Sequence, residues 1–146
     1  MYQLSDLDIL DNEARRVNQQ TGNQIETILR DMLKDLTTKS PILGVAIFSI
    51  EGLPLVSHFY GGTEEVTIAA MVASMYSAAE QSVKELRQGS LKSVIVEGEF
   101  GTTIVIAIPD GYLLCVTAPE NAKLGLVFND AKKAAHETGR VIREML

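Results

Sequence analysis

Residues 64–88 constrain the fold most, because this long helical segment carries two apolar stripes where one would suffice. The first stripe comprises Ala69, Val72, Tyr76, Ala79, Val83 and Leu86. The second, about 100° further around the helix, comprises Ile68, Met71, Met75, Ala78 and Ser82. A surface helix of a monomer needs a single apolar stripe. We therefore predict that one stripe packs on the sheet of its own chain and that the other meets a second surface.

Two arrangements would cover the second stripe: deep burial inside a monomer, or contact with the same helix of a second copy. A chain of 146 residues holds little other material to wrap the helix. The sequence therefore favours a homodimer, and two-fold pairs are the commonest oligomers. A dimer also presents two copies of the remaining, mildly polar side of the helix. That side is the predicted partner-binding surface, with Ser74, Ser77, Gln81 and Lys84.

Apolar periodicity and turn residues predict the element order α-β-β-α-β-β-β-α. Apart from 64–88, the predicted helices span 23–38 and 120–145. The predicted strands span 43–50, 53–59, 91–97, 102–108 and 112–118. Turns at Glu51-Gly52 and Pro109-Asp110-Gly111 indicate antiparallel hairpins, so helices must cover both faces of the sheet. The expected fold class is α/β, in the α+β sense.

The helix ends and the domain limits follow from local signals. Asn23 is the expected cap of the first helix of the domain and Thr63 that of the long helix. Residues 1–22 are polar and acidic, and end at Thr21-Gly22. We interpret them as an appendage, with a short amphipathic helix, to a domain that spans 23–146.

Composition argues against several classes of partner. The net charge is −6 and no Lys/Arg cluster occurs, whereas nucleic acids and anionic membranes are bound through such clusters. No apolar run approaches the roughly 20 residues that span a bilayer, and the N-terminus does not resemble a signal peptide. We therefore expect a cytoplasmic protein without membrane insertion. Cys115 lies in an apolar run, and we interpret it as a buried hydrophobic residue.

The residues that carry chemistry form no recognised motif, so we predict no catalytic residue, metal or cofactor. His58 and His136 lack a motif partner, and with one cysteine they give no zinc-ligand spacing. The acidic residues near the N-terminus lack the glycine and final glutamate of a calcium loop. Gly61-Gly62-Thr63 lacks the lysine of a phosphate loop and precedes two glutamates. Arg15-Arg16 is interpreted as ordinary surface arginine rather than as an arginine finger.

Two segments resemble the roadblock / dynein light chain family. Ile42–Ser57 (ILGVAIFSIEGLPLVS) is similar to the first hairpin of these domains, and Ala118–Val127 (APENAKLGLV) to the entry into their last helix. A long alanine-rich helix lies between them, as in the family, and the resemblance covers about residues 23–146. It implies a profilin-like, five-stranded antiparallel sheet with the long helix on one face and the terminal helices on the other.

The resemblance also implies a function. Family members dimerise through the long helix and the third strand, and serve as platforms or regulators for Ras-like GTPases, while others are dynein light chains. No catalytic residue is a fixed family feature. By position, the implied dimer interface comprises Ile68, Met71, Met75, Ala78, Ser82, Leu91, Ser93 and Ile95. The expected function is a homodimeric module that binds and regulates a small GTPase. A structural adaptor of dynein-light-chain type, and a ligand sensor or enzyme on a profilin-like scaffold, are the alternatives.

Overall fold

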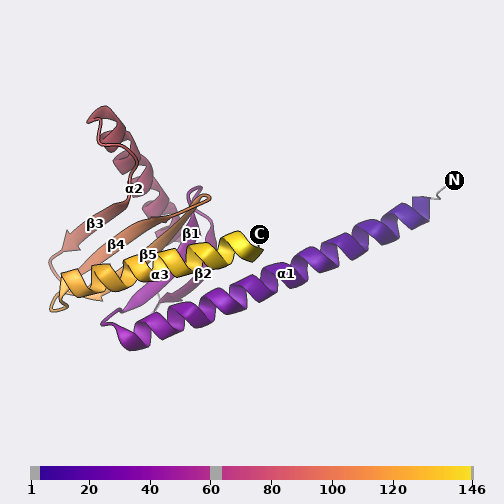
Figure 1. Cartoon of the computed structure of the whole chain (residues 1–146), viewed down its shortest axis with the longest axis horizontal. Helices are drawn as coiled ribbons and strands as arrows, with labels where there is room; N and C mark the ends of the chain where they lie inside the picture. The colour runs from indigo at the N-terminus through magenta and orange to yellow at the C-terminus, as the bar shows by residue number, and fades with distance from the viewer. Residues whose placement is uncertain (1–3, 60–63, 146) are drawn as a thin grey trace.

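The computed structural model describes residues 4–59 and 64–145, and the predicted element order is confirmed (Figure 1). The helices are α1 (Leu4–Lys39), α2 (Glu65–Glu85) and α3 (Leu124–Met145). The strands are β1 (Gly44–Ser49), β2 (Pro54–Phe59), β3 (Ser93–Gly98), β4 (Gly101–Ile108) and β5 (Tyr112–Pro119). None of the helices in the described ranges is long and apolar enough to cross a membrane.

The five strands form one sheet in the order β2-β1-β5-β4-β3, with antiparallel pairing throughout. Short turns join β1 to β2, β3 to β4 and β4 to β5, whereas β1 and β5 pair although they are far apart in the sequence. Between β4 and β5, Asp110 and Gly111 adopt positive φ angles of 70° and 90°, which Asp and Gly tolerate better than most residues. The order places β2 and β3 at the two edges of the sheet.

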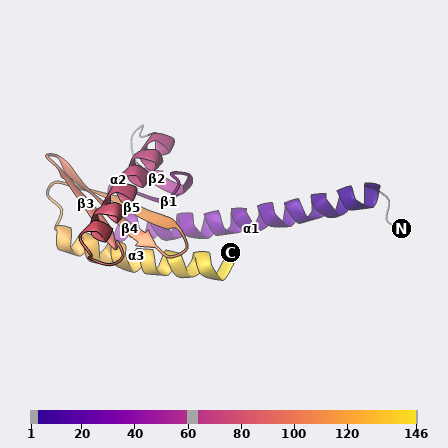
Figure 2. The ribbon, with the colours of Figure 1, turned by 90° about the horizontal axis from the view of Figure 1, so that it is seen from above.

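Helices cover both faces of the sheet, as predicted. The helices α1 and α3 run side by side on one face, where Leu29, Leu33, Leu114, Val127 and Ile142 belong to a common core. The helix α2 lies on the other face, over a smaller core (Figure 2). Successive side chains of each strand point alternately into the two cores, so the central residues of the strands are apolar on both faces of the sheet.

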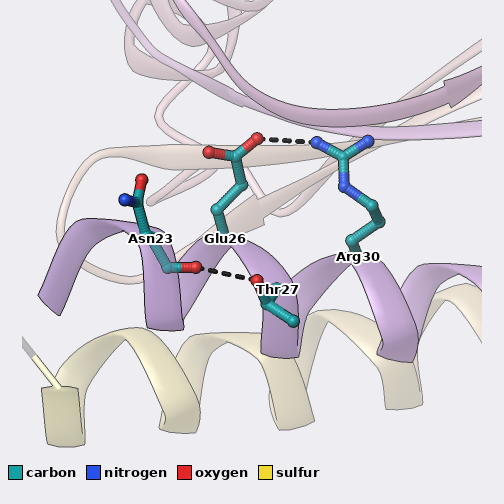
Figure 3. Close-up of polar contacts among 4 residues, drawn as sticks. All are labelled: Asn23, Glu26, Thr27 and Arg30. Atoms are coloured by element: carbon teal, nitrogen blue, oxygen red, sulfur yellow. Dashed lines mark hydrogen bonds and ion pairs between the residues drawn. The ribbon is translucent and has the colours of Figure 1, made fainter. Parts of the chain in front are cut away.

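The structure corrects the start of the first helix: α1 is one continuous helix from Leu4, not a short helix followed by a second one capped by Asn23. Figure 3 shows Asn23 inside the helix, where its backbone carbonyl accepts a 2.9 Å hydrogen bond from the Thr27 hydroxyl. Beside it, Arg30 and Glu26 form a 2.6 Å ion pair. A single glycine such as Gly22 weakens a helix by about 1 kcal/mol and does not interrupt it. The domain limit at residue 22 itself stays a prediction.

The other boundaries shift by a few residues. The helix α2 starts at Glu65 with Glu64 as its cap residue, and the predicted cap Thr63 lies outside the described residues. It ends at Glu85 rather than near Gln88, because Arg87 takes a positive φ of 56°. The strand β3 begins at Ser93 rather than Leu91. The helix α3 begins at Leu124 rather than Glu120, since a turn follows Pro119.

Candidate functional site

The first stripe of α2 attaches this helix to its own sheet. Ala69, Val72 and Ala73 are its buried residues, and Ala69 and Val72 pack on a core that includes Phe48 and Cys115. Small residues at these positions let the helix backbone approach the strands closely. The stripe is less well covered toward the C-terminus, where Leu86 is 64% exposed.

The second stripe is only partly covered in the part of the chain that the structure describes, where Ile68 and Met75 pack against the core under α2. Met71 is 54% exposed, Ala78 and Ser82 are exposed, and Ile68 and Met75 are half-buried. Ile68, Met71 and Met75 line an apolar hollow of about 350 Å³ between α2 and the sheet, together with Leu43, Phe59, Val72, Thr103, Cys115 and Thr117. The structure therefore brings these three candidate residues together, and places Ala78 and Ser82 along the following turns of the same helix.

The candidate residues around β3 lie apart from this stripe. Ser93 pairs with Ile106 and Ile95 with Ile104, and directly paired residues point to the same face of an antiparallel sheet. Ile104 and Ile106 belong to the α1–α3 core. Ser93 and Ile95 therefore point away from α2, although β3 does lie at the predicted sheet edge.

The candidate set predicted from the sequence does not include Val94 and Val96, yet these two residues share the α2 face. They pair with Val105 and Thr103, and Val94 packs against the core under α2. Val96 is 41% exposed. The alternation along the strand already separated them from Ile95, but only the register with β4 shows which of the two sets faces α2.

The predicted partner surface follows the outward side of α2. Ser74, Ser77 and Gln81 are exposed, and the Ser74 hydroxyl donates to the Ala70 carbonyl at 3.0 Å. The Lys84 ammonium lies 3.3 Å from a Glu80 carboxylate oxygen. Burial raises the pKa of the nearby Tyr76 hydroxyl, and the Glu80 charge and hydrogen bond add to this effect. The side of α2 thus offers hydroxyls, an amide and an ion pair.

The remaining candidates for chemistry are scattered. His58 lies on β2 and His136 on α3, and Arg15 forms a 2.9 Å ion pair with Asp11 on α1. Gly61, Gly62 and Thr63 lie outside the described residues. Within 4–59 and 64–145, no three His, Cys, Asp or Glu side chains gather where a metal ion could bind. The candidate site therefore offers a surface for contact with another molecule, on which apolar side chains lie beside adaptable polar ones.

Cys115 lies under α2, fully buried in the strand β5. Burial raises the pKa of its thiol to about 12, which makes the reactive thiolate scarce at neutral pH, and a reagent cannot reach the sulfur because the residue is fully buried. We expect a thiol reagent such as Ellman's reagent to leave the native protein unmodified and to label one group per chain in denaturant. Because the folded pKa exceeds the unfolded one, folding stability should fall as the pH rises above about 9. Rapid labelling of the native protein at neutral pH would contradict this burial.

Comparison with known proteins identifies the architecture. The family model described as Roadblock/LC7 domain matches residues 28–118, more than half of the chain. The chain belongs to the Roadblock/LC7 domain family. This family is a fold of binding and adaptor modules.

Individual proteins are also similar to this chain. An uncharacterized protein of Methanocaldococcus jannaschii, MJ1340, is 28% identical over 106 residues, which cover 73% of this chain and 92% of that protein. The solved structure of MglB with a tetrameric arrangement is similar at a TM-score of 0.78 and 21% identity, covering 84% of this chain and 93% of that one. Profilin IA of Acanthamoeba castellanii is similar at 0.53 and 14% identity, covering 75% and 92%. The two structural likenesses confirm the expected profilin-like Roadblock/LC7 fold.

Proposed function

We propose that this Roadblock/LC7 protein is a homodimeric binding module that recognises a small Ras-like GTPase and regulates it. The observation that carries the proposal is the second stripe of α2, of which Met71, Ala78 and Ser82 are exposed. Met71 is 54% exposed on a helix whose other apolar side already packs on the sheet. An exposed apolar strip of this kind marks an interaction surface.

The dimer buries the second stripe of α2 against its copy. The edge strand β3 pairs with β3 of the second copy, which protects its free backbone groups. On the α2 side of this junction, Val94 and Val96 add apolar contacts to those of Met71 and Met75. MglB, a protein of the same fold, was solved with a tetrameric arrangement, which supports self-association here.

The GTPase docks on the outward side of the paired α2 helices, at Ser74, Ser77, Gln81 and Lys84. The module acts by binding one conformation of the switch loops better than the other, since only such differential affinity can shift a conformational equilibrium. It supplies no catalytic residue and no cofactor, and is not itself an enzyme. It works in the cytoplasm, where its partner resides.

The test is light scattering of the purified protein, alone and mixed with Ras-like GTPases from the same cell. Alone and at low micromolar concentration, the mass should be twice 15.9 kDa. A larger mass with only one of the GDP-bound and GTP-analogue-bound forms supports regulation, and hydrolysis rates then show its direction. A dimer that ignores every GTPase in both states would contradict the proposal and favour the structural adaptor.

A charge-reversal variant checks the partner surface. Gln81→Glu combined with Lys84→Glu should weaken GTPase binding about tenfold and leave the dimer mass unchanged, because both side chains are exposed and outside the second stripe. A matched control, Asn121→Glu with Lys123→Glu, makes the same charge change in the exposed turn before α3. Calorimetric titration of the three proteins gives the dissociation constants. Equal affinities would exclude this side of α2 as the docking site.

A further inference from the structure

The N-terminal part of α1 extends beyond the rest of the molecule. We call residues 4–24 the arm: every side chain described in it is exposed, and the first buried residue of α1 is Ile25. Figures 1 and 2 both show the arm projecting past the sheet and past the end of α3. At 1.5 Å per residue the arm is roughly 30 Å long. A helix of this length, in which every described side chain is exposed, gains little stability from burial against its own chain.

The arm is amphipathic and acidic. Leu7, Leu10, Ala14 and Val17 recur at spacings of three and four residues along one side. Leu7 is 53%, Leu10 57% and Val17 60% exposed. Anchors at this spacing are what a helix inserts into an apolar groove. The acidic residues that precede the first base of the arm are Asp6, Asp8, Asp11 and Glu13.

Two arms are poor partners for each other. Asp6, Asp11 and Glu13 flank the apolar side of the arm. In a parallel pair of arms, Asp6 of one would face Asp11 of the other. This like-charge contact opposes association, although the ion pair of Asp11 with Arg15 in the same arm offsets part of the repulsion. In an antiparallel pair, Asp6 would face Glu13. A surface that binds the arm should therefore be apolar where it meets Leu7, Leu10, Ala14 and Val17, and basic where it meets the flanking acidic residues.

The same chain carries such a groove on the α3 side of β3. It is a hollow of about 510 Å³ with Leu91, Ile106 and Phe128 among its apolar residues. Lys92, Lys132 and His136 also line it, and its lining residues include no Asp or Glu. The Lys132 ammonium lies 5.3 Å from the centre of the Phe128 ring. We call this hollow the β3–α3 groove. Its charge and its apolar floor complement those of the arm.

We propose that the arm of one copy docks in the β3–α3 groove of another copy. Its own groove is out of reach, because α1 is a continuous helix whose N-terminal end lies at the opposite end of the molecule from β3 (Figure 1). In the proposed dimer, which joins two copies at β3, both arms point away from the junction. The arm therefore links one dimer to another, by a contact between two different surfaces. Such contacts close into a ring or continue as a chain.

A pair of matched substitutions in the arm tests the docking. Leu10 and Ile9 are both 57% exposed, but Ile9 lies off the apolar side. In the full chain, Leu10→Ser should raise the concentration at which dimers associate by about tenfold, and Ile9→Ser should leave it unchanged. Sedimentation equilibrium over a range of concentrations gives this value. A mass that never exceeds the dimer, or equal effects of the two substitutions, would overturn the proposal.

Charge exchange locates the contact. Glu13→Lys and Lys132→Glu should each weaken the association of dimers, and the double variant should restore it, since opposite charges again face each other. Asp8→Lys makes the same charge change as Glu13→Lys on the far side of the arm and serves as its control. High salt should weaken the wild-type assembly. Single variants that weaken without rescue in the double variant would place the arm elsewhere and overturn the groove assignment.

The proposed dimer and the docking of the arm can fail separately. The dimer depends on the second stripe of α2, so Met71→Glu addresses it without touching the arm or the groove. If the mass of the Met71→Glu variant still increases with concentration, and adding Leu10→Ser abolishes this increase, the docking of the arm stands without the dimer. If wild-type protein is a dimer at every concentration, the dimer stands and the docking is overturned.

Discussion

Met71→Glu is expected to convert the protein from a dimer into a monomer. The side chain is 54% exposed in the single chain, so the substitution leaves the fold intact. In the proposed dimer the same carboxylate would be buried without a partner. Such a charge costs about 3 kcal/mol or more, which corresponds to a dissociation constant raised more than about a hundredfold. Light scattering at micromolar concentration should then give 15.9 kDa.

Val66→Glu is the matched control for this substitution. Val66 is an apolar residue of the same helix and is 70% exposed, but it lies on the opposite side of α2 from the second stripe. Its replacement should leave the dimer mass unchanged. If Met71→Glu also remained a dimer, the second stripe would not be the interface, and another surface would have to hold the two copies together.

Phe48→Ala is expected to destabilise the folded chain by about 3–5 kcal/mol, because it removes a large side chain from a site that cannot collapse. Phe48 is fully buried in β1 and joins the sheet to α2. The free energy of unfolding, measured by urea titration with circular dichroism, should fall by this amount. That is a large part of the 5–15 kcal/mol typical of a domain.

Phe100→Ala is the matched control, because it makes the same substitution at an exposed site. Phe100 is 77% exposed in the tight turn between β3 and β4, so its loss should change the free energy of unfolding by no more than about 0.5 kcal/mol. Equal destabilisation by the two substitutions would mean that α2 does not pack on Phe48 as described.

The β4–β5 hairpin and the helix α1 show which features a local sequence pattern can predict and which it cannot. The strands β4 and β5 were predicted almost to the residue, since alternation and a Pro-Asp-Gly turn act locally. The helix α1 was divided wrongly, because Thr21-Gly22 is a weak local signal that can be read as a break. Continuity of the helix through this point depends on the helix-forming residues on both sides. It is supported by ion pairs one turn apart, such as Arg15–Asp11 and Arg30–Glu26.

The strand β3 shows the other limit. Its alternation separates Ser93 and Ile95 from Val94 and Val96 without structural information. Which pair faces α2 depends on the register with β4, where Val94 meets Val105 and Ile95 meets Ile104. A shift by one residue would exchange the two faces, and no signal within the strand itself forbids it. The candidate interface from the sequence therefore combined residues from both faces of the sheet.

The amino-acid sequence by itself determined the order of elements, the two-sided cover of the sheet and the surplus apolar stripe on α2, because these follow from periodicity within single segments. The tertiary structure alone decided what lies next to what. Met71 lies beside the hollow under α2, and Ser93 and Ile95 point toward α3. The arm projects away from the rest of its own chain. Such neighbours come from packing between distant segments, and a one-dimensional pattern does not contain them.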